Sequence, residues 1–71
     1  MRKQFELSDP NSCTNKANNN EMMFTLLGRD PAAPGAIRFW CQMRILLGKN
    51  KLEDEQIQGA LSAALIMEKE R

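Results

Sequence analysis

The sequence predicts a mainly α-helical protein: an antiparallel helical hairpin, preceded by a short apolar helix or strand, that forms a homo-oligomer. Apolar side chains recur at helical spacing through residues 34–47 and again through residues 52–70. Only residues 48–51 connect the two stretches, and so short a link makes two helices antiparallel neighbours. The chain has 71 residues, which is one domain at most.

A chain of this length rarely buries enough apolar surface to be stable alone, so it needs a disulfide, a metal or a partner. It has two cysteines and no histidine, which argues against a metal site. A Cys13–Cys41 bridge is an alternative, but it would tie a polar tail to an apolar helix, and nothing indicates an oxidising compartment. Self-association is the remaining explanation, and we therefore expect an obligate homo-oligomer.

Residues 1–20 are predicted to be a flexible polar tail, and residues 21–71 a single helical-hairpin domain. Asparagine, serine and aspartate dominate the tail, and their side chains compete with regular backbone hydrogen bonding. Phe5 and Leu7 are its two anchor candidates, and the alternative is that they dock on a neighbouring subunit.

Residues 22–28 form the first apolar run, which is too short for its periodicity to separate helix from strand. Its methionines and leucines slightly favour a short helix ending at Gly28. A strand buried on both faces is the alternative.

Helix-capping and helix-breaking residues predict the ends of the two main helices. Asp30 is a good helix cap, and the prolines that follow it suit a first turn, so the first helix should run from about residue 34 to 47 and end at Gly48. Asn50 and Glu53 form a capping-box pattern for the second helix, over about residues 52–70, with Asp54 as a rival cap.

The first main helix is apolar nearly all round, with Phe39 and Leu46 on the side opposite Ile37. One partner helix cannot cover such a surface, which indicates an interface. The second helix is apolar on one face, and small residues such as Gly59 and Ala63 recur on the other. That spacing permits close helix contact, although simple alanine-rich helix propensity explains it equally well.

Basic residues gather on residues 29–51, which carry five positive charges against one negative charge. On the first main helix, Arg44 falls between Trp40 and Cys41, inside the apolar arc of the helix. There it either reaches solvent, pairs with Glu68, or faces an anion pocket. The turn containing Arg29 and Asp30, with Arg38 beyond it, flanks a helix start that attracts anions. The aromatic ring of Trp40, or its neighbour Phe39, could stack on a base, although both are expected first of all to be core residues. The predicted ligand-binding residues are Arg29, Asp30, Arg38, Trp40 and Arg44.

Several functional classes are disfavoured. The chain has no histidine for general-base catalysis and no glycine-rich phosphate loop, so we expect no enzyme activity, no catalytic residue and no cofactor. Carboxylates at residues 53–55 would repel DNA from the start of the second helix. No stretch approaches the length of a membrane span.

Short blocks of this sequence, Met23–Asp30, Ala33–Pro34, Ile37–Trp40, Gly48–Asn50 and Ile66–Glu68, resemble a group of small phage and prophage accessory proteins. The resemblance covers about residues 21–68. It implies that the protein is the product of a phage accessory gene and acts in the host cytoplasm. It assigns no catalytic or binding residues.

In that setting the first hypothesis is an anti-defence protein that sequesters a small anionic nucleotide messenger at a subunit interface, by analogy alone. The alternative is an inhibitor that binds a host enzyme or defence protein through the apolar face of the first helix. A purely structural phage component is a third reading.

Overall fold

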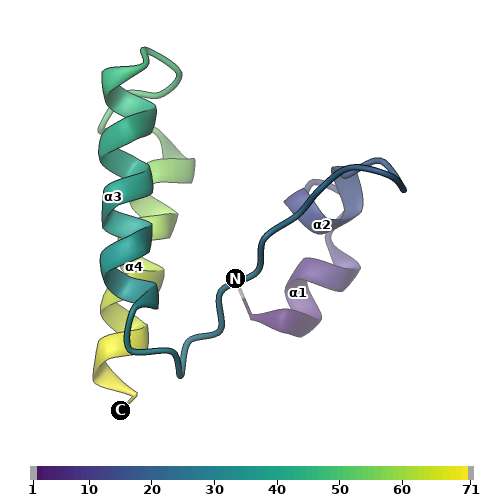
Figure 1. Ribbon diagram of the computed structural model, residues 1–71, viewed down its shortest axis with the longest axis horizontal. Helices are drawn as coiled ribbons and strands as arrows, with labels where there is room; N and C mark the ends of the chain where they lie inside the picture. Colours follow the sequence, from purple (N-terminus) through teal and green to yellow (C-terminus); the bar gives the residue numbers. More distant parts are fainter. Residues whose placement is uncertain (1, 71) are drawn as a thin grey trace.

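The computed structural model describes residues 2–70, which contain four helices and no strand. The two short helices α1 (Lys3–Ser8) and α2 (Cys13–Lys16) precede the two long helices α3 (Ala33–Leu46) and α4 (Glu55–Lys69). Figure 1 shows α3 and α4 packed side by side as a hairpin, with α1 and α2 set apart from it. The predicted mainly helical hairpin is therefore confirmed.

The turn after α3 ends this helix as the sequence predicts. Gly48 has a φ of +73°, a left-handed conformation that glycine adopts without a steric penalty. Because this residue reverses the chain, α4 can return along α3. The bounds of α3 differ from the prediction by a single residue at each end.

The start of α4 differs more from the prediction, because the helix begins at Glu55 instead of near residue 52. The expected capping box at Asn50 is wrong, since Asn50 Oδ1 instead accepts a hydrogen bond of 2.6 Å from Arg44 Nε. Asp54 occupies the cap position, but its Oδ2 accepts from the backbone N–H of Lys51 at 2.9 Å. Both side chains that could cap the helix therefore close the preceding loop.

The hairpin core is narrow. Among residues 2–70, the buried hydrophobic residues are Ala33, Cys41, Ile57, Ala60 and Ala64. Ile57 is the only large side chain of this set, and Ile37 and Leu61 pack at its margin. Small residues on α4 let the two helices approach closely but bury little apolar area.

Residues 21–27 form neither the helix nor the strand that was predicted, since they adopt no regular structure. A helix of seven residues is too short to be stable without packing, and a strand needs a neighbouring strand. The side chains of Met22 and Phe24 remain 94% and 88% exposed, so no packing surface compensates. The C-terminal end of this segment reaches the hairpin, where Gly28 lies against the Met67 side chain.

Residues 3–16, expected to form part of a polar tail, instead fold into α1 and α2. The side-chain amide of Asn15 donates to the backbone carbonyls of Glu6, Leu7 and Asp9. Ser12 accepts a hydrogen bond from the Asn15 N–H and donates to the Glu6 carbonyl. Polar side chains thus hold the two helices together, while the predicted flexibility of this region stays a prediction.

The N-terminal helices are joined to the hairpin by an exposed ion pair. Arg2 Nη2 lies 2.8 Å from Glu70 Oε2, and Arg2 Nη1 also donates to Glu70. The cysteines are both free thiols, with Cys13 exposed and Cys41 buried, so the Cys13–Cys41 bridge is not formed. No helix within residues 2–70 combines the length and apolar character that crossing a bilayer requires.

Candidate functional site

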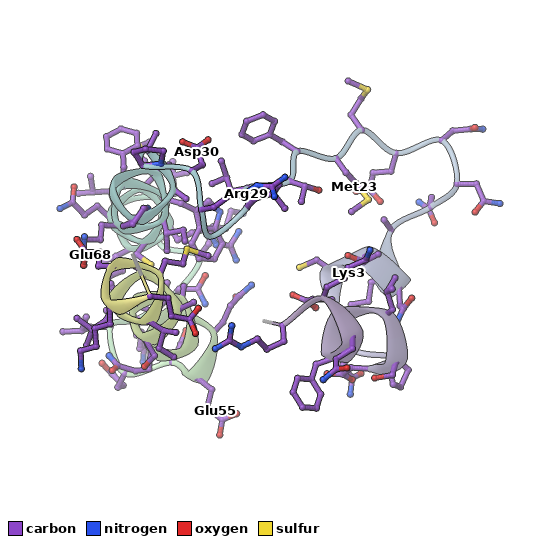
Figure 2. The ribbon with its side chains drawn as sticks, turned by 90° about the horizontal axis from the view of Figure 1, so that it is seen from below. Lys3, Met23, Arg29, Asp30, Glu55 and Glu68 are labelled. Atoms are coloured by element: carbon purple, nitrogen blue, oxygen red, sulfur yellow. The ribbon has the colours of Figure 1, made fainter. Side chains whose placement is uncertain are left out.

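The five predicted ligand-binding residues are spread along the hairpin. Arg29 and Asp30 lie in the turn that leads into α3, whereas Arg44 lies in the last turn of this helix. In Figure 2, Arg29 is on the side of the hairpin that faces the N-terminal segment, and Glu68 is on the opposite side. Arg38 is bonded to Glu68, so the arginines of one chain do not surround a common position.

Arg38 forms an ion pair between α3 and α4. Its Nη1 donates to Glu68 Oε2 at 3.2 Å, and its Nη2 donates to the other oxygen of the same carboxylate. This side-chain hydrogen bond raises the pKa of the Arg38 guanidinium. The carboxylate that was expected to pair with Arg44 thus pairs with Arg38, and it compensates the positive charge of Arg38 within the chain.

Arg44 fastens the loop between the two helices. In addition to the bond from Arg44 Nε to Asn50 Oδ1, its carbonyl oxygen accepts from the N–H groups of Lys49 and Asn50. Asn50 Nδ2 then donates to Asp54 Oδ2 at 3.0 Å. The hydrogen bonds from Lys51 and Asn50 lower the pKa of the Asp54 carboxyl, the backbone bond being the larger cause.

The Arg44 guanidinium also lies over the ring of Trp40, with Cζ 5.7 Å from the ring centroid. Such stacking is a cation–π contact, which holds both side chains in one arrangement. The Arg44 guanidinium therefore has two partners within the chain, the Trp40 ring and the loop residue Asn50, and it does not pair with Glu68. Both residues act within the chain, and a role in ligand binding stays a prediction.

Asp30 organises the turn into α3. Its Oδ1 accepts from the Ala32 N–H at 2.9 Å, and its carbonyl oxygen accepts from the Ala33 N–H at 3.0 Å. The prediction that Asp30 caps the helix is wrong in position, because Ala32 is the residue that precedes the first helical residue. Asp30 instead fixes a turn of the kind that aspartate stabilises.

A continuous apolar surface covers the side of α3 that faces away from α4. We call it the outer stripe. Its members follow the spacing of one helix face and are all exposed: Ala36, Phe39, Trp40, Met43, Leu46 and Leu47. Leu46, Leu47 and Phe39, at 79%, 64% and 63% exposed, are the most open of its large side chains. The prediction that Phe39 and Leu46 lie on the side of the helix opposite Ile37 is confirmed.

The outer stripe carries no charge. Residues 33–47 contain two charged side chains, and neither is a member of the stripe. Arg38 contacts Glu68 of α4, whereas Arg44 contacts Asn50 of the loop and stacks over Trp40 at the edge of the stripe. The prediction of a helix that is apolar nearly all round assigned Phe39 and Leu46 to the far side but did not identify the whole exposed face. The signal that could have done so is the 3–1–3–3–1 spacing between residues 36 and 47, which matches one helical face.

Two shallow hollows lie in the N-terminal part of the chain. Residues of α1 line the first, together with Arg2, and residues between Cys13 and Phe24 line the second. Neither hollow contains any of the predicted ligand-binding residues. Within residues 2–70, no group of three or more cysteine or acidic side chains is arranged to hold a metal ion.

Comparison with known proteins gives no relative for this chain. No protein-family model matches it, and no curated protein or solved structure is detectably similar to it. The residues and their geometry are therefore the basis for any functional proposal.

Proposed function

We propose that this protein is a non-catalytic interaction module that works by docking the outer stripe of α3 on an apolar protein surface. The observation that carries the proposal is the contrast in burial along α3. Cys41 is buried against α4, while Phe39 and Leu46 on the other side are 63% and 79% exposed, with no other element of residues 2–70 covering them. A monomeric soluble protein rarely leaves so continuous a patch of large apolar side chains exposed.

The chemistry of the stripe defines the partner. It offers aromatic, methionine and leucine side chains without a charge, and residues of these kinds dominate the buried centre of protein interfaces. An uncharged surface gains nothing from a charged ligand, because there is no ion pair to form. The matching surface is apolar and protein-like, such as the face of another helix.

The resemblance to phage accessory proteins adds a setting to this proposal. In a host cell, a host enzyme or defence protein is one source of such a surface, and a second copy of the chain is another. The outer stripe supports the inhibitor hypothesis more directly than the nucleotide hypothesis. The nucleotide site would need Arg38 and Arg44, which already have partners within the chain.

Site-specific photocrosslinking in producing cells tests the proposal. A benzophenone amino acid in place of Phe39 reports on the stripe, and the same group in place of Ser62, exposed on α4, is the matched control. We expect position 39 to form a discrete crosslinked protein adduct that position 62 does not form. Equal adducts from both positions, or none from position 39, would contradict docking through the stripe.

A further inference from the structure

The single chain exposes more surface than a folded protein of its mass normally does. Its accessible surface is 5976 Å². A compact monomer of 8.1 kDa exposes about 4,500 Å² by the usual scaling of surface with mass. The open placement of α1 and α2, set apart from the hairpin, adds to this surface (Figure 1). The outer stripe is the part of the hairpin surface that is apolar and that a partner can remove from water.

The area of the stripe matches what a symmetric dimer requires. From the exposed fractions of its large side chains, the stripe presents roughly 600 Å² per chain, so two copies that covered it fully would bury about 1,200 Å². That total lies at the lower limit of specific protein–protein interfaces. The contact would also cover Phe39, whose aromatic ring is the type of side chain that dominates interface energetics.

Charge permits a second copy on this face. Two identical charged faces would repel each other, but the stripe carries no charge, and the arginines of α3 are bonded to Glu68 and Asn50. Two copies can therefore bring their stripes together without like-charge repulsion between stripe residues.

The shape of the stripe also favours an antiparallel pair. The stripe is narrow at Ala36, near the start of α3, and wide at Leu46 and Leu47, near its end. In an antiparallel arrangement, the narrow end of one helix meets the wide end of the other. Met43 then lies opposite Trp40 at the centre, where a thioether packs well against an aromatic ring.

From these observations we infer that the protein partner of the outer stripe is a second copy of this chain, with α3 packed antiparallel on α3 about a two-fold axis. This inference rests on the proposed docking function and names its partner. The arrangement brings two hairpins together as a layer of four helices, with the two α3 helices in the middle and the α4 helix of each subunit on the outside, so that each subunit covers the other's exposed apolar face.

Sedimentation equilibrium of the purified full chain, over a range of micromolar concentrations, tests this inference. Wild type should sediment at twice the 8.1 kDa of one chain. Phe39→Glu puts two carboxylates into the interface and should weaken dimerisation about 100-fold or more. Ile66→Glu is the matched control, because Ile66 lies nine residues from Ile57 and hence on the far side of α4. This control should remain a dimer.

Circular dichroism separates loss of the dimer from loss of the fold, since Phe39 is exposed in the single chain and its replacement leaves the hairpin core intact. A dimer that Ile66→Glu dissociates and Phe39→Glu does not would overturn the inference. So would a folded wild-type monomer. In that case a Phe39-specific crosslink to a different protein would preserve the docking function, and its absence would remove both.

Discussion

The two faces of α3 are built from similar kinds of residue but differ in what covers them. The inner face places Cys41 against the small side chains of Ala60 and its neighbours, and the helices lie close together. The outer face carries larger side chains, such as Phe39 and Leu46, and no element of residues 2–70 covers it. The comparison teaches that the size of apolar residues, as well as their spacing, separates a hairpin core from a docking surface.

Ile57→Ala should give the largest effect on the inner face. Ile57 is the one large side chain with an exposed fraction of 0% within the described chain, so its truncation leaves a cavity. We expect a loss of about 2–5 kcal/mol in the free energy of unfolding, measured by urea denaturation. Ile66→Ala removes the same atoms from a half-exposed position on α4 and should cost clearly less. Equal losses would mean that the inner face is not the core.

The nucleotide hypothesis requires that Arg29, Arg38 and Arg44, in and before α3, bind an anion. If an anionic nucleotide binds there, Arg29→Ala should weaken its binding about tenfold or more, because hydrogen bonds to charged groups contribute about 1.5–3 kcal/mol. Calorimetric titration with cyclic and linear nucleotides measures this change. Arg2→Ala, which removes an arginine paired with Glu70, is the matched control.

Unchanged nucleotide affinity in Arg29→Ala, Arg38→Ala and Arg44→Ala would remove the predicted ligand site. The docking surface would remain, because none of these three side chains is a member of the outer stripe.

Gly48→Ala should destabilise the hairpin through its loop. A side chain at a φ of +73° costs about 1–2 kcal/mol, so thermal unfolding should shift to lower temperature. Gly59→Ala is the matched control, since Gly59 lies within α4 and a Cβ there meets nothing within 4 Å. This second replacement should stabilise the protein by about 0.5–1 kcal/mol through helix propensity. A destabilised Gly59→Ala variant would indicate a close contact at this face.

Acid should weaken the loop that joins the two helices. Hydrogen bonds hold the pKa of Asp54 below its ordinary value of 3.8, so its carboxylate contributes stability above that pH. This contribution is lost as the pH falls through the lower pKa of the folded state. Glu70 behaves in the same way through its bond to Arg2. We expect Asp54→Asn to flatten the dependence of the unfolding midpoint on pH below 4. An unchanged slope would contradict this role of Asp54.

The helical spacing of apolar residues predicted α3 and α4, and Gly48 predicted the turn between them, because these signals are local. The start of α4 was missed because Arg44 engages Asn50 across the loop, a contact that helix-capping rules do not describe. Residues 21–27 were misjudged because their structure depends on packing that is absent from the single chain. The candidate ligand residues were chosen by type and charge, and the pairing of Arg38 with Glu68 is a tertiary contact.

In the functional protein, another protein surface should cover the outer stripe. Trp40, the only tryptophan, belongs to the outer stripe and is 40% exposed in the single chain, so its fluorescence reports directly on whether the stripe is covered. Emission and acrylamide quenching of wild type should be compared with those of the Phe39→Glu variant at the same concentration. We expect wild type to emit at shorter wavelength and to be quenched less. Identical emission and quenching would show that nothing covers the stripe and would contradict the account.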